Sequence, residues 1–466
     1  MTELISRNLL TRYDVTGPRY TSYPTADRFV EAFSERDLIQ ALHIRSEVGA
    51  ATPLSVYVHI PFCQSVCYYC ACNKVVTKQK SRAQRYVHDL GRQVSLLRQQ
   101  LGDGQVISQL HLGGGSPTFL SDTELSDLMA MLRRSFHMTP GGEYSIEVDP
   151  RTVNEPRLEY LFALGFNRLS FGVQDFDPLV QQAVHRVQST QSVFDLVAHA
   201  RRIGFESVNV DLIYGLPRQT LESFRRSLEL VSQLRPDRLA VYAYAHLPSR
   251  FKPQRRIMAS ELPEGSEKLG MLSTAISYLD RVGYDYIGMD HFALPDDSLS
   301  VAKRQGRLHR NFQGYSTQPD CDLLALGVSA IGRMGNTYSQ NAKTIEEYSD
   351  ALDQGRLPIV RGLVLNHDDI VRRALIMTIM CRGYVDFQAF EENYLIDFRA
   401  HFSKELAELS ELCDHGLLSL SEEGFRVSAQ GWFFVRAIAM VFDRYLRETG
   451  GHRSSALLKN YLVAWT

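Results

Sequence analysis

The sequence contains no hydrophobic run long enough to cross a bilayer, and its N-terminus, MTELISRNLLTRYDV, lacks the apolar core of a secretory signal peptide. We therefore expect a cytoplasmic protein that does not contact a membrane. Strong charge of either sign is also missing, because 51 Lys and Arg oppose 53 Asp and Glu for a formal net charge of −2. Without a global positive field, nucleic acid is not an expected partner, and any anion site must come from a local basic cluster.

Cysteine is scarce and unevenly placed. Of the seven cysteines, Cys321, Cys381 and Cys413 are scattered, which suits free thiols in a reducing compartment better than a disulfide framework. The other four fall within ten residues in a C-x3-C-x2-C-x-C array. They are Cys63, Cys67, Cys70 and Cys72.

Thiolates are soft ligands, so this array favours an iron-sulfur centre or zinc. Three closely spaced cysteines can hold three corners of a four-iron cluster and leave the fourth iron open for another ligand. Structural zinc sites usually pair one C-x2-C knuckle with a distant second pair, and no such partner follows downstream. An iron-sulfur cluster is the preferred interpretation, with zinc as the alternative.

From residue 55 onward, short β-rich runs alternate with helical periodicity, which is the pattern of a parallel sheet with crossover helices. An apolar stripe from Val87 to Leu101 predicts a helix after the first strand, and Ser121 with Glu124 predicts the capped start of the next one. Six such units predict an α/β fold with a partial (β/α)6 TIM-like barrel. The expected strands are 56–60, 110–114, 144–148, 168–173, 208–213 and 238–244.

The chain divides by pattern into three parts. Residues 1–54 show little periodicity and are rich in aromatic, hydroxyl and proline residues, so we interpret them as an N-terminal arm docked on the body, with a disordered tail as the alternative. Residues 55–345 form the expected barrel domain, and residues 346–466 a mostly helical C-terminal domain.

The C-terminal part shows helical patterns over 370–381 and 404–418, a hairpin pattern over 417–428 and a further helix. This order is typical of a winged helix, which raises DNA binding as an interpretation. The candidate helices carry no basic stripe, so a lid or packing domain is preferred.

Glycines and polar residues gather where the predicted strands end. In parallel barrels these carboxyl ends and the loops after them face the active site. Glycines let backbone approach a ligand without interference from Cβ, although a bare tight turn would look the same. The residues so placed are the cysteine loop, Gly113 to Gly115, Glu147 with Asp149, Gln174 with Asp175, and Asp211.

At the cysteine array the chain resembles the radical S-adenosylmethionine (SAM) enzymes, whose signature is C-x3-C-x2-C after the first barrel strand. The extra Cys72, the preceding YVHIPFC and the following NK make it similar to the oxygen-independent coproporphyrinogen III oxidase (dehydrogenase) family. Ala71 and Ser116 depart from the family's usual glycine and threonine. The agreeing segments are PRYTSYPTA (18–26), HLGGGSPT (111–118), EVDPR (147–151), SFGVQDFD (170–177), VDLIYGLP (210–217), YAHLPSRFKPQRRI (244–257) and RLHRNFQGYSTQ (307–318).

The resemblance implies a [4Fe-4S] cluster ligated by Cys63, Cys67 and Cys70, with Cys72 supporting the loop, and it implies two SAM molecules. Contacts to the first SAM carry over to Tyr57, Gly114, Glu147 and Ile331. Contacts to the second carry over to Tyr69, Gly115, Ser116, Gln174, Arg186, Asp211 and Ala245. A structural ion pair is the alternative for Arg186 and Asp211. No further residue is assigned as catalytic.

The resemblance also implies a reaction, the oxygen-independent oxidative decarboxylation of two propionates of coproporphyrinogen III to vinyl groups. It would use a 5′-deoxyadenosyl radical and give protoporphyrinogen IX in haem biosynthesis, in a monomer served by an unidentified low-potential electron donor and an electron acceptor. Arginines fit propionates because their planar fork matches a carboxylate, although each could equally lie on a solvated face. The candidates are Arg19, Arg250 to Arg256, Arg307 and Arg310.

Two other functions fit parts of the pattern. A haem-handling relative, either a haem chaperone or a haem-degrading methyltransferase, would share the barrel and cluster, but such relatives generally lack the PRYTSYPTA arm and Cys72. A non-catalytic iron-sulfur sensor that binds DNA would need the basic stripe that the C-terminal helices lack.

Overall fold

The computed structural model describes residues 7–13, 17–48 and 52–448. These residues form two compact units. The larger unit comprises 29–271 and 321–364, and the smaller unit comprises the described residues before 29, those of 272–320 and those from 365 onward. In this described part of the chain, no helix combines the length and the apolar character that a membrane span needs. The three-part division read from the sequence stays a prediction.

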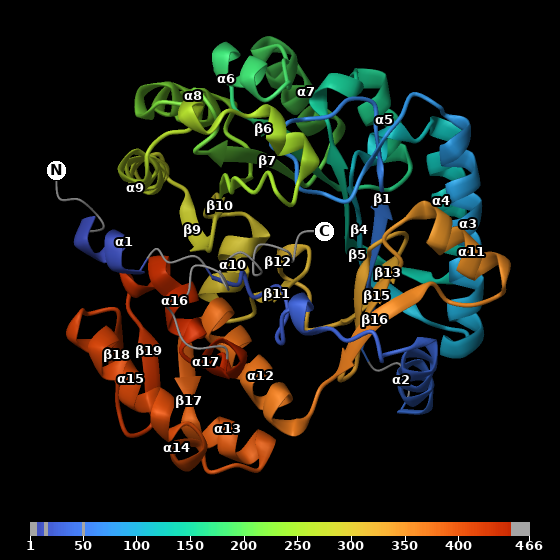
Figure 1. The fold of residues 1–466 in the computed structure, drawn as a ribbon. Helices are drawn as coiled ribbons and strands as arrows, with labels where there is room; N and C mark the ends of the chain where they lie inside the picture. The colour runs from blue at the N-terminus through green and yellow to red at the C-terminus, as the bar shows by residue number, and fades with distance from the viewer. Residues whose placement is uncertain (1–6, 14–16, 49–51, 449–466) are drawn as a thin grey trace. The chain divides into compact units, whose positions relative to one another are not determined.

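A mostly parallel sheet is the frame of the larger unit (Figure 1). Neighbouring strands are parallel from β13 to β8, whereas β13 to β16 pair antiparallel. The expected α/β class is therefore confirmed, with an antiparallel extension that the sequence did not indicate. In spatial order the strands are β16 (Ile359–Val364), β15 (Thr337–Asn341), β14 (Ile331–Met334), β13 (Asp322–Leu326), β1 (Leu54–Ile60), β4 (Val106–Gly114), β5 (His137–Val148), β6 (Arg168–Gln174), β7 (Ser207–Tyr214) and β8 (Arg238–Ala243).

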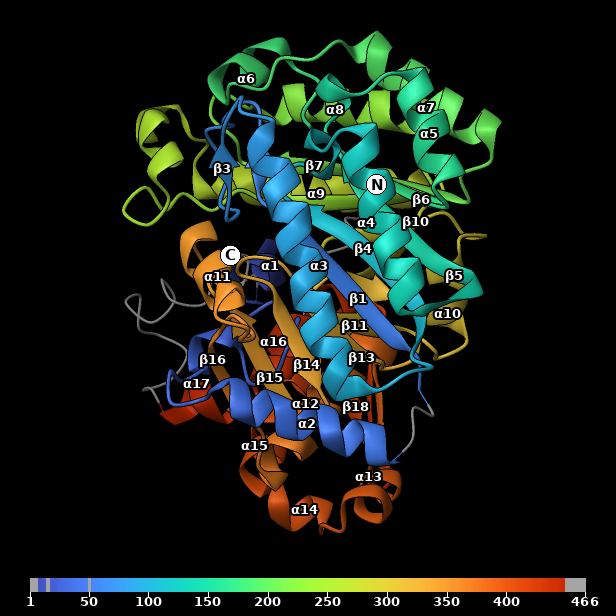
Figure 2. The same ribbon diagram turned by 90° about the vertical axis from the view of Figure 1, so that its right-hand side faces the viewer.

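Helices connect these strands, and Figure 2 shows α3 and α4 lying over β1 and β4. Helix α3 buries Leu90, Val94 and Leu97 along the predicted stripe. Helix α4 begins with the expected capping box, in which Ser121 and Glu124 exchange hydrogen bonds. The helices are α2 (Glu35–Val48), α3 (Ser81–Leu101), α4 (Asp122–Ser135), α5 (Glu155–Ala163), α6 (Pro178–Ala183), α7 (Thr190–Ile203), α8 (Leu221–Leu234), α9 (Gly265–Arg281) and α11 (Ile345–Asp353).

The smaller unit is mostly helical around the antiparallel sheet β17-β19-β18. The expected order of helix, helix, hairpin and helix is present, with the predicted hairpin formed by β18 and β19. Its elements are α1 (Arg7–Tyr13), β9 (Asp285–Gly288), β10 (His291–Ala293), α10 (Ser298–Arg304), β11 (His309–Asn311), β12 (Gly314–Ser316), α12 (His367–Arg382), β17 (Tyr384–Asp386), α13 (Phe387–Tyr394), α14 (Phe398–His401), α15 (Ser403–Asp414), β18 (Leu418–Leu420), β19 (Gly424–Val427), α16 (Val435–Met440) and α17 (Arg444–Glu448).

The N-terminal segment belongs to the core of this smaller unit. Tyr20 and Tyr23 are fully buried. The hydroxyl of Tyr20 donates to Asp443 at 3.0 Å, and the backbone N–H of Arg444 donates to the hydroxyl of Tyr23 at 3.2 Å. The arm is therefore divided, because Tyr20 and Tyr23 pack in the smaller unit, whereas residues 29–48, with α2, belong to the larger unit.

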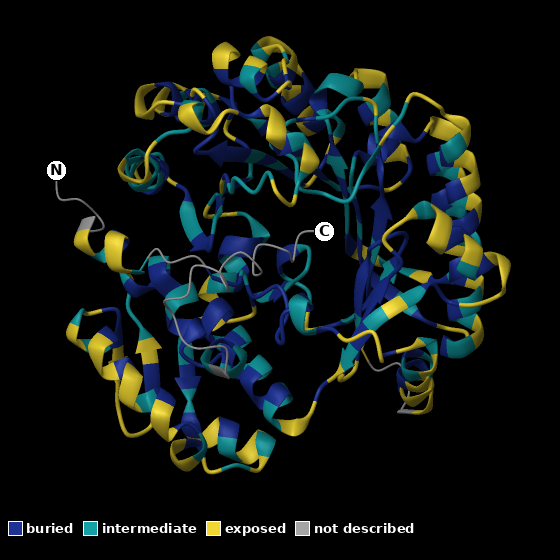
Figure 3. Cartoon of the chain, viewed as in Figure 1, coloured by how far each residue is buried: buried dark blue, intermediate teal, exposed yellow. Residues whose placement is uncertain are grey.

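Burial follows the layers (Figure 3), with the strands buried and the outer faces of the helices exposed. Beneath α3, two side chains bind the backbone at the end of β1 and after β13. Tyr86 donates its hydroxyl to the carbonyl of His59 at 2.8 Å and accepts from the N–H of Val328 at 2.9 Å. The side chain of Gln93 accepts from the N–H of Gly327 at 2.9 Å. One helix therefore anchors the strand from which the cysteine loop departs.

We expect Tyr86→Phe to lower the free energy of unfolding by about 1–3 kcal/mol, because it leaves the buried His59 carbonyl and Val328 N–H without a partner. Urea denaturation would measure the loss. Tyr160→Phe is the matched control, since its hydroxyl bonds the Asp122 carbonyl at an exposed site where water can replace it. Equal stability of the two variants would show that the Tyr86 hydroxyl does not anchor β1.

Candidate active site

The cysteine loop leaves the sheet at the end of β1 and is bound at once to the end of β4. Strand β2 (Phe62–Cys63) pairs with β3 (Val75–Val76), which closes the loop at its base. The N–H of Gly115 donates to the carbonyl of Ile60 at 2.8 Å, and the N–H of Ser116 donates to the carbonyl of Phe62 at 2.9 Å. The loop therefore starts at a fixed position over the carboxyl ends of the strands.

The glycine run permits this close approach. A Cβ on Gly115 would lie 2.6 Å from the carbonyl oxygen of Pro61, nearer than real Cβ atoms come. Gly114 has φ of +112°, and a Cβ there would lie 2.7 to 2.9 Å from the ring of His59. Two of the three glycines are thus required by packing of the cysteine segment, whatever ligand they also meet.

The thiol of Cys67 is buried and lies between two arginines. Arg186 Nη1 and Arg151 Nη2 donate to its Sγ at 3.4 and 3.5 Å. A hydrogen bond from the thiol of Cys72 lowers the pKa of Cys70 to about 6. Cys72 thus contacts a neighbouring sulfur, and its loop-supporting role stays a prediction.

The donor set fits an iron-sulfur cluster. Cys63 and Cys70 are half-buried, and burial raises the pKa of Cys63 to about 12, so a metal must displace its proton. Lys74 Nζ donates to the carbonyls of Cys70 and Cys72, each at 3.3 Å, and so holds the end of the loop. In the described chain no three His, Cys, Asp or Glu side chains converge on a single ion. A cluster does not require that, since each iron takes its own thiolate.

Three of the four residues expected at the first SAM come together. Glu147, near the end of β5, accepts from the N–H of Gly114 at 3.2 Å, and its side chain is 42% exposed. His111 Nε2 lies 3.2 Å from Glu147 Oε1, and Tyr57 stacks on the His111 ring with centroids 5.9 Å apart. Ile331 starts β14, which is separated from β1 by β13. Its buried side chain leaves the backbone as the group able to meet a ligand.

Arg186 and Asp211, expected at the second SAM, do not pair with each other. In the described residues Arg186 instead contacts Asp149 at 3.3 Å and donates from Nε to the carbonyl of Gly172 at 3.1 Å. Asp211 accepts from Asn209 Nδ2 at 2.8 Å. Arg186 therefore pairs with Asp149 and not with Asp211, because its guanidinium points toward the cysteine loop, and the roles of the two residues at the second SAM stay predictions.

Two of the other second-site candidates, Tyr69 and Ala245, are bridged by a buried glutamine. Gln254 is 1% exposed, and its Nε2 donates to the carbonyls of Tyr69 at 3.0 Å and Ala245 at 3.2 Å. Gln174 ends β6 with φ of +72°, a left-handed conformation unusual for a side chain of its size. The hydroxyl of Ser116 is buried and bonds that of Thr118 at 3.2 Å. The sequence analysis named the neighbouring arginines but not Gln254. The position of this neutral residue within the basic run PQRR could have indicated it.

The candidate propionate-binding arginines of the larger unit differ in their surroundings. Arg250 is exposed and lies close to Lys343, whose pKa is lowered by burial and by repulsion from Arg361 and Arg250. Arg255 is exposed and donates to the carbonyl of Pro248 at 3.0 Å. Of these two, Arg250 belongs to a group of neighbouring cations of the kind that suits an anionic ligand. Arg256, the third candidate, is exposed, and its guanidinium lies 5.1 Å from the centre of the Tyr68 ring.

In the smaller unit, Arg310 is 5% exposed and its Nε donates to the carbonyl of Arg19 at 3.2 Å. Arg19 forms an ion pair with Asp290. Buried polar atoms of Arg310 (Nη1) and Gln313 (both side-chain amide atoms) have no hydrogen-bond partner in the described chain. Arg307, by contrast, is exposed and bonds Gln305. Of Arg307 and Arg310, Arg310 is therefore the stronger candidate for binding a propionate.

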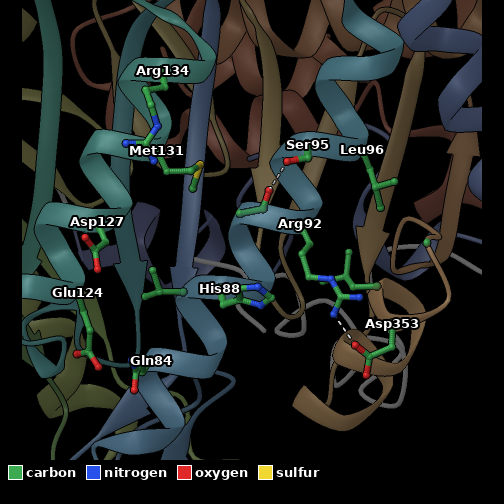
Figure 4. A pocket seen from close by; sticks show the side chains of 14 residues that line it. Gln84, His88, Arg92, Ser95, Leu96, Glu124, Asp127, Met131, Arg134 and Asp353 are labelled. Atoms are coloured by element: carbon green, nitrogen blue, oxygen red, sulfur yellow. Dashed lines mark hydrogen bonds and ion pairs between the residues drawn. The ribbon is translucent and has the colours of Figure 1, made fainter.

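A groove of about 770 Å³ lies on the outer helical layer of the larger unit and is unrelated to these candidates. Figure 4 shows it between α3, α4 and the segment around Asp353, which pairs with Arg92. Its lining mixes acidic, basic and apolar side chains and includes none of the candidate ligands. Volume alone therefore does not identify the active site.

Burial raises the pKa of Asp211 to about 7, against about 3.9 for an unfolded chain. The folded protein then keeps a proton that the unfolded chain releases, so the stability contributed by this group falls as pH rises from about 4 to 7. Asp211→Asn cannot release the proton. As pH rises from 5 to 8, we therefore expect the free energy of unfolding to fall by about 1–3 kcal/mol less in Asp211→Asn than in the wild type.

Urea denaturation at several pH values would measure this difference. Asp127→Asn, on the exposed face of α4, is the control and should follow the wild type. Parallel pH profiles for wild type and Asp211→Asn would mean that Asp211 ionises in the folded protein as it does in water.

Comparison with known proteins agrees with this geometry. The Radical SAM superfamily profile matches residues 57–231, and the HemN C-terminal domain profile matches 365–434. The oxygen-independent coproporphyrinogen III oxidases of Pseudomonas aeruginosa and Escherichia coli are 48% and 47% identical to the chain. The alignments cover 97% and 94% of this chain and 98% and 95% of those proteins.

Among solved structures, the coproporphyrinogen III oxidase (HemN) from Escherichia coli, described as a radical SAM enzyme, matches with a TM-score of 0.90 at 45% identity. The match covers 95% of this chain and 99% of that one. Both units of the fold lie within the aligned range, since relatives extend over nearly the whole sequence. The chain therefore belongs to the oxygen-independent coproporphyrinogen III oxidase family of radical SAM proteins.

Proposed function

We propose that the chain is an oxygen-independent coproporphyrinogen III oxidase. It removes the carboxyl groups of two propionates of coproporphyrinogen III as carbon dioxide and leaves vinyl groups, giving protoporphyrinogen IX. The observation that carries the proposal is the three-thiol loop, bound to the glycine end of β4 beside Glu147. The names of the relatives support this oxidase and not a haem chaperone or a haem-degrading methyltransferase.

The cluster would be held by Cys63, Cys67 and Cys70, and with bound SAM it would supply the 5′-deoxyadenosyl radical that takes a hydrogen atom from the propionate carbon β to the carboxyl. Loss of carbon dioxide, and of one electron to an acceptor, would then leave the vinyl group. The protein's own groups orient the cofactor. Glu147, held at Gly114, offers a carboxylate to the SAM ammonium or ribose hydroxyls.

The assignment of the individual cofactor contacts is part of this proposal. Tyr57, Gly114, Glu147 and the backbone of Ile331 would serve the first SAM. The support for a second SAM is that its candidate residues end neighbouring strands or border the loop. They are Tyr69, Gly115, Ser116, Gln174, Arg186, Asp211 and Ala245.

The decisive experiment is an anaerobic assay of the reconstituted protein with coproporphyrinogen III, SAM and dithionite. We expect protoporphyrinogen IX, carbon dioxide and 5′-deoxyadenosine to form together. Formation of 5′-deoxyadenosine without any vinyl product, under conditions where a known member of the family is active, would contradict the proposal.

Replacing Cys63, Cys67 or Cys70 by Ala should abolish assembly of the cluster, lowering iron from about four per chain to near zero, and should stop SAM cleavage. Cys72→Ala should retain the iron, because Cys72 acts on the neighbouring sulfur of Cys70. Iron and sulfide analysis after anaerobic reconstitution measures both. Full cluster occupancy together with SAM cleavage in Cys67→Ala would contradict the assignment of Cys67 as an iron ligand.

Arg250→Ala should raise KM for coproporphyrinogen III about tenfold, since a charge-assisted hydrogen bond to a propionate contributes about 1.5–3 kcal/mol. Arg255→Ala, five residues along the same exposed segment, donates to a backbone carbonyl and is the matched control. SAM cleavage in the absence of porphyrinogen should be unchanged in both variants. A larger KM effect from Arg255→Ala would exclude Arg250 as the anchor.

Substitution of Arg19 alone tests its part in substrate binding more directly than deletion of the whole N-terminal segment. Tyr20 and Tyr23 are core residues of the smaller unit, so a truncation would chiefly test folding.

A further inference from the structure

A buried carboxylate that is assigned to no ligand lies directly after β6. Asp175 is 1% exposed. Its Oδ1 accepts from the N–H of Asp177 at 2.7 Å and from the hydroxyl of Ser227, in α8, at 2.8 Å. Its Oδ2 accepts from Nε2 of Gln219. Burial raises the pKa of Asp175, and these donors oppose the rise. Both oxygens of the carboxylate are thus fixed by hydrogen bonds.

Gln219, which is 2% exposed, joins this carboxylate to the end of β7. The same Nε2 also donates to the carbonyl of Ile213 at 2.9 Å. Its Oε1 accepts from the backbone N–H groups of Gly215 at 2.5 Å and Leu216 at 3.1 Å. Every hydrogen-bonding position of the amide is therefore occupied. The ends of β6 and β7 are held together by this side chain as well as by their backbone pairing.

The residue before Asp175 is Gln174, a candidate contact of the second SAM, and its φ of +72° is left-handed. A residue other than glycine keeps such a conformation where its surroundings impose it. The carbonyl of Asp175 also accepts from Nε2 of Gln181, in α6, at 2.9 Å. Both the side chain and the backbone of Asp175 are thus fixed on the C-terminal side of Gln174.

The side chain of Gln174 lies against Gly172. A Cβ on Gly172 would lie 2.8 Å from Nε2 of Gln174 and 3.2 Å from Nη2 of Arg186. The absence of a side chain at residue 172 therefore leaves room for both groups. Two candidate contacts of the second SAM, one amide and one guanidinium, are brought together at this point.

We propose that Gln219 and Asp175 are positioning residues for the second SAM, an inference that rests on the proposed function. Their polar side-chain atoms already bind protein groups, so they act on the ligand through their neighbours. Asp175 fixes the backbone beside Gln174, and Gln219 ties that backbone to the end of β7, the strand that carries Asp211. The pair thereby sets the spacing between candidate contacts on two strands.

The first SAM would depend on other strands. Its candidates Tyr57, Gly114 and Glu147 lie on β1, β4 and β5. The groups that bind the side chains of Gln219 and Asp175 come from β7, the loop after it, α8 and the N-cap of α6. Loss of the pair should therefore weaken the binding of one SAM and spare the other.

The test is a two-site binding measurement on Gln219→Met, which keeps the length of the side chain and removes the amide. Equilibrium dialysis of labelled SAM against the reconstituted protein, without reductant so that SAM is not cleaved, reads both sites. We expect one Kd equal to that of the wild type and the other raised about tenfold, the effect of losing about one hydrogen bond. Ser227→Ala removes one donor to Asp175 and should raise the same Kd about threefold.

Gln109→Met is the matched control, because Gln109 is also a buried amide that binds a buried carboxylate. Its Nε2 donates to Glu143 at 3.2 Å, and its Oε1 accepts from the hydroxyl of Ser55 at 2.7 Å. It lies toward the amino end of β4, away from the strand ends that carry the candidate contacts. Both Kd values should therefore stay as in the wild type.

Three results would overturn the proposal. They are unchanged Kd values in Gln219→Met and Ser227→Ala, an equal rise at both sites or an equal effect of Gln109→Met, and a wild type that binds a single SAM. If Gln219→Met does not fold, Ser227→Ala decides between the outcomes. A wild type that binds two SAM but makes no protoporphyrinogen IX with dithionite would overturn the proposed function alone, because positioning is read from binding.

Discussion

The contact of the Pro61 carbonyl with Gly115 determines where the rest of the candidate site lies. Because residue 115 has no side chain, the start of the cysteine loop rests directly on the end of β4. The two hydrogen bonds beside it, from Gly115 to Ile60 and from Ser116 to Phe62, then set the height of the loop over the sheet. Tyr86 holds the same strand end from below. These backbone contacts therefore fix the position of the thiols in the cysteine loop.

Charge balance at Cys67 links the loop to the neighbouring strands. A guanidinium as buried as that of Arg186 requires a compensating charge, and here a carboxylate and a sulfur both supply it. The same arginine is a proposed contact of the second SAM. Through its contacts with Cys67 and Asp149, Arg186 therefore links the cysteine loop to the segment that follows β5.

The sequence predicts those parts of this arrangement that depend on local pattern. Alternation of apolar residues located the parallel strands, the Ser121–Glu124 box located the start of α4, and the strand ends located Glu147. Asp211, also expected at a strand end, lies instead within β7. Contacts between residues distant in the chain were not accessible in this way. The sequence analysis did not predict β13 or its pairing with β1, because strand pairing depends on tertiary packing. Nor could it show that Tyr20 meets Asp443 or that Gln254 binds Tyr69.

The smaller unit is assembled from three separate stretches of the chain, which passes between the units near residues 28, 271, 320 and 364. Its core joins the first stretch to the last through Tyr20 and Asp443, and the middle to the last through the indole N–H of Trp432, which donates to the carbonyl of Ile287 at 2.9 Å. On the ribosome, the first and middle stretches must therefore wait for the last one to be synthesised before their shared core can close. A unit interleaved in this way cannot be lost, gained or exchanged by a single cut in the gene, so the two units are bound to evolve as one piece.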